Sequence, residues 1–207
     1  MVSPAGRGAG TIAAGAQMEA LPLTPGALLL ARHGQTDDNL EPLRAQGFRD
    51  TPLNAVGLAQ ARALAERVAR ELDVRSLWSS DLSRAATTAR VVGERIGLEV
   101  ALDERLREGN RGDWEGRLFT EIAATEPDLY AAWLRGGAGF RFPGGESLQE
   151  HSDRVWEALQ EIRAQGPLPA MVVCHRGSIR TVLCRSDPRG LDAFHDHDVP
   201  NTGVVVC

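Results

Sequence analysis

Short apolar runs alternate along the chain with longer segments in which apolar residues recur every three or four positions. Two of the runs, residues 27–31 and 170–174, are typical of strands buried on both faces of a sheet. Weaker runs predict further strands at 74–78, near 99–102 and at 203–207.

Helical periodicity marks the segments between these strands. Leu64 and Val68 give one apolar face to a helix over residues 54–71. We expect Asp81 to cap a second helix that runs to about residue 96, and Ser147 with Glu150 to form the capping box of a third. Residues 178–184 predict a short fourth helix.

Strands that alternate with helices imply a parallel sheet covered on both faces. We therefore predict an α/β fold, a three-layer αβα sandwich with a mostly parallel central sheet, in one domain over residues 26–207. Residues 109–146, rich in glycine and aromatic side chains, are interpreted as a small cap insertion and are called the cap segment. Residues 1–25 are rich in Ala, Gly and Pro without periodicity, which predicts a mobile tail.

Composition narrows the function classes. The chain has 207 residues, 43% hydrophobic and 25% charged, which is typical of a globular protein. Its net charge of −5 is opposite in sign to that of general nucleic-acid binders, so we expect no nucleic-acid partner. No apolar run approaches the length of a membrane span, so we expect no membrane partner either. The three cysteines do not suit a disulfide scaffold, and we expect a cytoplasmic protein.

Charged and nucleophilic side chains follow the predicted strands at the point where each strand ends. Arg32 and His33 come directly after the run 27–31, and His175 comes directly after 170–174. Arg84 lies about one helical turn after the strand at 74–78, and Glu108 follows the strand near 102. Because the carboxyl ends of parallel strands meet at one edge of a sheet, we expect these five residues to converge there.

Two histidines, several arginines and a glutamate suit phosphoryl transfer through a histidine. A neutral imidazole is a good nucleophile, and guanidinium groups neutralise phosphate oxygens through paired hydrogen bonds. Glu108 fits the proton donor to the leaving alkoxide if a bound phosphate dianion raises its pKa. Because these groups supply the positive charge, we expect no metal and no cofactor.

The same residues lie in blocks that resemble the histidine phosphatase superfamily, also called phosphoglycerate mutase-like, from about Leu28 to the C-terminus. A lone Arg-His-Gly is weak evidence, whereas a series of blocks in the family's order is specific. The blocks are 32–36 with Asn39, positions within 47–61, 79–89, 106–116, 143–147, and the block at His175.

The resemblance implies a role for each matching residue. His33 would be the nucleophile that forms a phosphohistidine, and Glu108 would be the proton donor that later activates water. The family pattern also implies that the phosphoryl oxygens would be bound by Arg32, Arg84 and His175, and that Asn39 would line the same pocket.

Two features depart from the family pattern. Arg176 stands where many members have glycine after the second histidine, a position from which it could reach substrate. Asp37 and Asp38 bring two carboxylates to the entrance, which would disfavour highly anionic substrates.

We predict a metal-independent phosphomonoesterase that passes phosphate from a small organic phosphate to His33 and then to water. A 2,3-bisphosphoglycerate-dependent phosphoglycerate mutase would use the same residues. That branch is longer and carries Trp-Asn in place of Asp38-Asn39, which favours hydrolysis here. A non-catalytic phosphate-binding regulatory protein is the third alternative, although nucleophile and acid are both present. The pattern leaves the natural substrate and the oligomeric state open.

Other conspicuous residues have simpler explanations. His195 to Asp198 superficially resemble a metal site, but the Pro-Asn that follows indicates a loop. Cys174 precedes His175 on a strand, so its side chain should point to the opposite face and be buried. In the cap segment we expect one or two of four aromatic residues to touch substrate: Trp114, Phe119, Phe140 and Phe142.

Overall fold

The computed structural model describes residues 11–12 and 26–207. In this part of the chain six strands form one sheet, in the order β1-β6-β2-β5-β3-β4. The strands are β1 (Thr11–Ile12), β2 (Leu28–Arg32), β3 (Ser76–Ser79), β4 (Val100–Leu102), β5 (Ala170–Cys174) and β6 (Val204–Val206). The expected tail, residues 1–25, lies outside the described residues except for β1, which pairs with β6.

Most of the sheet is parallel. β5 pairs in parallel with both β2 and β3, and β3 pairs in parallel with β4, whereas β6 pairs antiparallel with β2 and with β1. The register aligns Arg32 with Cys174 and Ser79 with Val173. The carboxyl ends of β2, β5 and β3 therefore lie at one edge of the sheet, and the predicted mostly parallel arrangement is confirmed.

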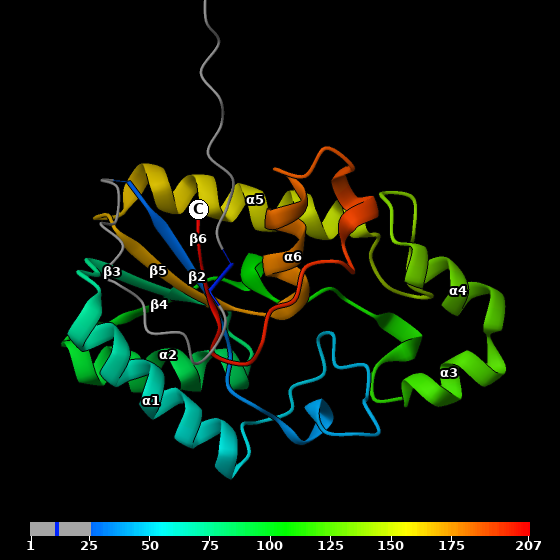
Figure 1. The fold of residues 1–207 in the computed structure, drawn as a ribbon, viewed down its shortest axis with the longest axis horizontal. Helices are drawn as coiled ribbons and strands as arrows, with labels where there is room; N and C mark the ends of the chain where they lie inside the picture. Colours follow the sequence, from blue (N-terminus) through cyan, green and yellow to red (C-terminus); the bar gives the residue numbers. More distant parts are fainter. Residues whose placement is uncertain (1–10, 13–25) are drawn as a thin grey trace, which may run out of the picture.

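The α-helices are α1 (Ala55–Glu71), α2 (Ser83–Ile96), α3 (Phe119–Thr125), α4 (Pro127–Arg135), α5 (Leu148–Gln165) and α6 (Arg176–Cys184), and short 3-10 helices span Asp37–Asn39, Glu104–Leu106, Gly112–Trp114 and Gly190–Ala193. Figure 1 shows α1 and α2 on one face of the sheet and α5 and α6 on the other. No helix of the described residues is long and apolar enough to cross a membrane.

Side chains along β2 alternate between the two faces. Leu28 and Leu30 belong to the core that also contains side chains of α5 and α6, whereas Leu29 and Ala31 belong to the core with α1 and α2. Burial on both faces explains why the strand is an unbroken apolar run in the sequence. The predicted three-layer sandwich is confirmed.

The cap segment contains α3 and α4, which lie to one side of the sandwich (Figure 1). Its aromatic residues were noted in the sequence, but the two helices were not predicted, although Pro127 at the first turn of α4 is a helix-start signal. The aromatic cluster that joins the segment to the rest of the chain includes Trp114, Ile122, Trp133, Phe140, Phe142 and Phe194.

Two helix starts differ from expectation. Asp81 does not cap α2, whose N-cap residue is Leu82, because its carboxylate binds the Arg107 guanidinium at two positions. α6 begins at Arg176 rather than at residue 178. The predicted capping box of α5 is confirmed, with hydrogen bonds of 3.1 Å and 2.9 Å between Ser147 and Glu150.

Candidate active site

His33 follows the last residue of β2, and the surrounding backbone fixes its position. Its N–H donates to the Cys174 carbonyl at 3.0 Å, and its carbonyl accepts from the Asn201 amide at 3.0 Å. The imidazole Nδ1 lies 2.6 Å from the Gly34 carbonyl. Because a carbonyl oxygen only accepts hydrogen bonds, Nδ1 carries the proton and Nε2 keeps its lone pair.

His175 follows β5 and brings a second imidazole beside the first. The ring centroids of His33 and His175 are 5.2 Å apart, so the expected convergence of the two histidines is observed. The Nε2 atom of His175 lies 2.9 Å from the hydroxyl of Ser80, the residue directly after β3. Its Nδ1 atom is buried and has no hydrogen-bond partner among the described residues.

Both imidazoles are held neutral. Burial, followed by the charges of Arg84 and Arg32, lowers the pKa of His33 well below its usual 6.5. Burial and Arg84 likewise lower the pKa of His175 well below 6.5. A neutral imidazole with a free Nε2 is the form that can attack an electrophile.

Two buried arginines, Arg32 and Arg84, lie close enough to His33 to affect its pKa. Arg32 donates through Nη1 to the Val199 carbonyl at 2.7 Å. Arg84 donates through both terminal nitrogens to the carbonyls of residues 47 and 49, each at 2.8 Å. These bonds fix the two guanidinium groups, yet the Nε atom of each is buried without a partner in the described part of the chain.

The Glu108 carboxylate accepts backbone hydrogen bonds at both oxygens. The Gly109 N–H lies 2.9 Å from Oε1, and the Gly177 N–H in the first turn of α6 lies 3.0 Å from Oε2. A side chain at position 177 does not fit, because a Cβ there would lie 2.2 Å from Oε1. This glycine lets α6 approach the carboxylate two residues after His175.

Burial by itself would raise the pKa of Glu108. The charge of Arg111, then His151 and the two backbone N–H groups, outweigh burial and lower the pKa to about 2. Without a phosphate group nearby, Glu108 is therefore a carboxylate. Its use as a proton donor requires that a bound phosphate raise this pKa.

His151 in α5 is a neighbour of Glu108 that the sequence analysis missed. Its Nε2 atom lies 3.9 Å from Oε1 of Glu108 and 3.0 Å from the Ser178 hydroxyl. That hydroxyl donates to the Arg107 carbonyl, so Nε2 of His151 carries the proton. Burial lowers the pKa of His151 to about 4. A polar residue on the apolar face of a predicted helix was the signal that could have identified it.

Arg154 of α5 holds the loop that carries Glu108. Its guanidinium donates to the carbonyls of residues 105, 107 and 108 at 2.9, 2.8 and 2.7 Å. It also pairs with Glu146, whose carboxylate accepts the Asn110 N–H at 2.7 Å. These bonds fix the backbone on both sides of Glu108.

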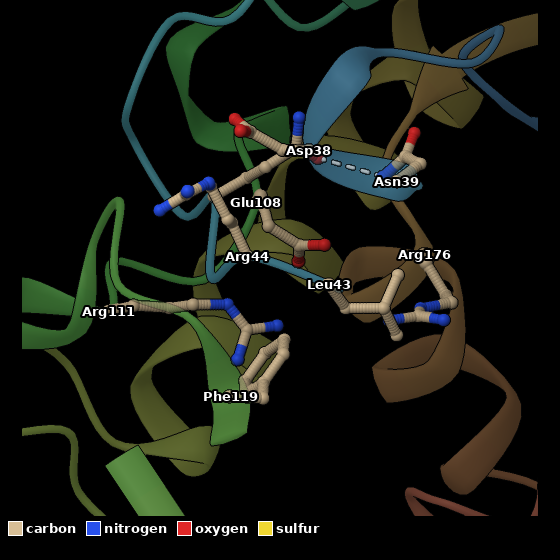
Figure 2. Close-up of a pocket in the computed structure, with 9 residues that line it drawn as sticks. Asp38, Asn39, Leu43, Arg44, Glu108, Arg111, Phe119 and Arg176 are labelled. Carbon is tan, nitrogen blue, oxygen red and sulfur yellow. Dashed lines mark hydrogen bonds between the residues drawn. The ribbon is translucent and has the colours of Figure 1, made fainter. Parts of the chain in front are cut away.

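A pocket opens beside Glu108, and Figure 2 shows the side chains that line it. Asn39 lines this pocket, and its side chain is held by Gln46 and Asn201. The lining residues do not include the two histidines, Arg32 or Arg84, which are buried. Arg111, which no local sequence signal singled out, lines the pocket together with Arg176.

The other charged residues near Glu108 and Asn39 are placed differently from one another. Arg105 and Arg107, which precede Glu108, pair with carboxylates at Asp103 and Asp81 instead of joining the histidines. Of the two acidic residues at the expected entrance, Asp38 lines the pocket and Asp37 does not.

Of the four aromatic residues of the cap segment expected near substrate, one lines the pocket and three do not. Phe119 lines the pocket, whereas Trp114, Phe140 and Phe142 are buried in the aromatic cluster. Cys174 is buried with a raised pKa, in the core between the sheet and α5 and α6, and is not a thiol nucleophile.

Comparisons with known proteins address this arrangement as a whole. Residues 28–207 match the sequence model of the histidine phosphatase superfamily (branch 1). The chain belongs to this superfamily. The chain is 38% identical over 183 residues to phosphoglycerate mutase-like protein 4 of Arabidopsis thaliana, a match that covers 86% of the chain and 77% of the relative. It is 30% identical over 179 residues to putative phosphoserine phosphatase 2 of Hydrogenobacter thermophilus, over 86% of the chain and 87% of the relative.

A solved structure of mycobacterial glucosyl-3-phosphoglycerate phosphatase in complex with VO3 has the same fold as this histidine phosphatase. The TM-score is 0.76 at 32% sequence identity, and the match covers 87% of this chain and 91% of the other. The expected family and the expected α/β fold are confirmed, and with them the expectation that the chain is an enzyme of this superfamily.

Proposed function

We propose that this member of the superfamily is a metal-independent phosphomonoesterase that hydrolyses a small organic phosphate through a phosphohistidine. A set of buried polar atoms without partners in the described residues carries the proposal: Nε of Arg32, Nε of Arg84 and Nδ1 of His175. Buried polar groups are nearly always hydrogen-bonded, so three such atoms grouped around His33 support a ligand at this place. A phosphate group between these residues would supply the missing acceptors.

The tautomer of His175 is compatible with a phosphate group bound between these residues. The Ser80 hydroxyl accepts from the Leu82 N–H at 3.3 Å and can donate its own proton to Nε2 of His175. Nδ1 then carries a proton and can donate to a phosphoryl oxygen.

The reaction would proceed in two displacements at phosphorus. First, Nε2 of His33 attacks, the bond from phosphorus to the substrate oxygen breaks, and Glu108 protonates that oxygen so that an alcohol leaves. Second, the Glu108 carboxylate takes a proton from water, the water oxygen attacks phosphorus, and the P–N bond breaks. Inorganic phosphate leaves, His33 is neutral again, and Glu108 is protonated as at the start.

Binding of the substrate would prepare Glu108 for the first step. A phosphate dianion brought beside a buried carboxylate raises the pKa of that carboxyl group, because the two negative charges repel each other. The shift starts from a pKa of about 2, so the proton enters with a monoanionic substrate or is taken up as the dianion binds.

Steady release of phosphate from p-nitrophenyl phosphate in the presence of EDTA tests the proposal. His33→Ala should lower kcat/KM by at least about 10³-fold, because the covalent route is lost. His197→Ala, which removes a histidine outside the site, is the matched control and should retain activity. Turnover that persists in His33→Ala would contradict the proposal, and a single release per chain without turnover would favour a regulatory phosphate-binding protein.

The name of the Arabidopsis thaliana relative, phosphoglycerate mutase-like protein 4, indicates a rival reaction, phosphoryl transfer by a mutase. A mutase would return the phosphoryl group from His33 to a second hydroxyl rather than to water. Incubation with 3-phosphoglycerate separates the two reactions: we expect release of inorganic phosphate, and conversion to 2-phosphoglycerate without release would establish the mutase.

A further inference from the structure

We propose that Arg111 and Arg176 form a second anion subsite beside the phosphate site, so that the natural substrate carries a second anionic group, a carboxylate or another phosphate. This inference rests on the proposed function and gives it a substrate class. Both arginines line the pocket beside Glu108, together with the apolar side chains of Leu43 and Phe119. Figure 2 shows the two guanidinium groups on opposite sides of the pocket, with the Glu108 carboxylate between them.

Arg111 is a buried cation that forms no ion pair with any carboxylate of the described residues. Only 8% of its surface is exposed, and its Nη1 atom has no hydrogen-bond partner among the described residues. Three aromatic rings cover the charge: the centroids of Phe142, Trp133 and Phe119 lie 5.1, 5.6 and 5.8 Å from the guanidinium carbon. Cation–π contacts offset part of the cost of burying the charge but use none of its N–H donors. Those donors are available to an anion in the pocket.

Arg176 supplies the second cation from the phosphate side of the site. It is the first residue of α6 and follows His175 directly. Its guanidinium forms no hydrogen bond or ion pair within residues 26–207.

Positive charge accumulates around this pocket in a protein whose net charge is −5. Burial, followed by the charge of Arg176, lowers the pKa of Arg32 to about 9 and the pKa of Arg180 to about 10. Arg176 also lowers the pKa of Arg111, after burial. An anion bound among these guanidinium groups would relieve their mutual repulsion.

The remaining charged residues of the pocket already have partners. The Arg44 guanidinium points away from the pocket (Figure 2) and donates to the Gly116 carbonyl at 3.0 Å. The Asp38 carboxylate accepts the Thr51 hydroxyl and lies 3.7 Å from Arg49. Asp38 is therefore a weaker obstacle to a second anion than its charge alone suggests.

A simpler role for Arg111 is to keep Glu108 ionised, because after burial its charge has the largest effect on that pKa. Glu108, however, already accepts hydrogen bonds from Gly109 and Gly177 and forms no ion pair with Arg111. A role limited to Glu108 would affect every substrate alike. A subsite would affect only substrates with a second anion, and this difference decides the experiment.

The experiment compares substrates that differ only in the second charge. ω-Carboxyalkyl phosphates of increasing chain length are paired with their primary amides, and alkanediol bisphosphates are paired with the corresponding hydroxyalkyl phosphates. For each pair, kcat/KM of the anionic compound divided by that of the neutral one gives a selectivity ratio. We expect a ratio of about 10 or more at the best chain length, the effect of one charge-assisted contact. The two series distinguish a carboxylate from a second phosphate.

Arg176 variants carry the test because this residue is only half-buried at the start of a helix. Arg176→Gln should lower the selectivity ratio about tenfold, and Arg176→Lys, which keeps the charge, should restore part of it. Arg44→Gln is the matched control: it removes an equal charge from a nearby arginine whose guanidinium points away from the pocket, and its ratio should stay within about twofold of the parent. Arg111→Met should lower the ratio as Arg176→Gln does, once thermal unfolding shows that the variant is folded.

Three outcomes would count against these ideas, and they are distinguishable. A ratio near 1 for every pair, in a protein that turns over the neutral compounds, overturns the subsite and leaves the phosphomonoesterase intact. Equal losses of the selectivity ratio in Arg44→Gln and Arg176→Gln also overturn the subsite, because the electrostatic effect of any nearby positive charge would explain both losses. Absence of turnover of all compounds, p-nitrophenyl phosphate included, overturns the proposed function and the subsite with it.

Discussion

His33 and His175 are held by the parallel sheet, whereas Arg111 and Phe119 on the pocket side are held by packing within the cap segment. The register of β2 with β5 brings the two imidazoles to a centroid distance of 5.2 Å. On the pocket side, Phe119 stacks on Trp133 at 5.0 Å, and both rings lie against Arg111. The region of His33 and His175, here called the strand side, thus depends on backbone pairing. The region of Arg111 and Phe119, here called the cap side, depends on particular aromatic side chains. We infer that separable parts of the molecule carry the chemistry and the selection of substrate.

After His33→Ala, the largest effect is expected at Glu108, where the two sides meet. Glu108→Gln keeps the shape of the side chain but can neither give nor take the proton, so kcat/KM for alkyl phosphates should fall about 10²–10⁴-fold. p-Nitrophenyl phosphate should lose less, because its leaving group needs little protonation. Steady-state kinetics with both substrates check this, and equal losses would argue against Glu108 as the acid.

Removal of Trp114 should damage the cap side alone. This side chain is fully buried in the aromatic cluster, and its Nε1 donates to Glu126 at 2.9 Å. Trp114→Ala should lower the free energy of unfolding by about 3–5 kcal/mol, measured by urea denaturation. Leu134→Ala, at an exposed position of α4, is the control and should change it by less than about 1 kcal/mol. A folded Trp114→Ala protein that loses as much kcat as Glu108→Gln would show that the two sides are not separable.

A methyl group at Gly177 tests the contact between α6 and Glu108. Gly177→Ala should lower kcat/KM about 10–100-fold, because the carboxylate must move away from the added Cβ. Gly139→Ala is the control, since no described atom lies within 4 Å of a Cβ at that position. Parent-like activity in Gly177→Ala would mean that this placement of the carboxylate is not needed.

Counted for each residue, the smallest effect is expected from pH, which acts on stability through the buried histidines. The pKa values of His33, His175 and His151 are all lowered in the folded protein. Below about pH 6.5 the unfolded chain gains protons that the folded chain excludes, so the free energy of unfolding should fall by up to about 1.4 kcal/mol per pH unit for each histidine. This stabilisation is fully present above pH 6.5 and is lost as pH falls toward the folded-state values.

Urea denaturation between pH 7.5 and 5.5 measures that slope. His151→Gln replaces one titrating group with an amide that can still donate to Ser178, so the slope should become shallower. An unchanged slope would show that His151 is not a neutral, buried group in the folded protein.

The strand side could be predicted from the sequence because its signals are local. The apolar runs before Arg32 and His175 are buried on both faces, and a parallel sheet then requires their carboxyl ends to meet. The capping box of Ser147 and Glu150 is likewise a local pattern and is confirmed.

The cap side could not be predicted in the same way. Arg111 sits in a glycine-rich stretch whose periodicity gives no sign of burial, and its surroundings come from rings far along the chain. Asp81 failed as a helix cap for a related reason, because a distant residue, Arg107, binds its carboxylate. Long-range side-chain contacts of this kind leave no trace in a single sequence.

Trapping the phosphorylated protein tests most directly whether His33 is the nucleophile of the strand side. Glu108→Gln mixed with p-nitrophenyl phosphate should release a burst of about one p-nitrophenolate per chain, because dephosphorylation is slowed more than phosphorylation. Mass spectrometry of peptides from an alkaline quench should locate the phosphate on His33. The burst should be absent in the double variant that carries both Glu108→Gln and His33→Ala. Phosphate on any other residue, or a burst that persists without His33, would contradict the account.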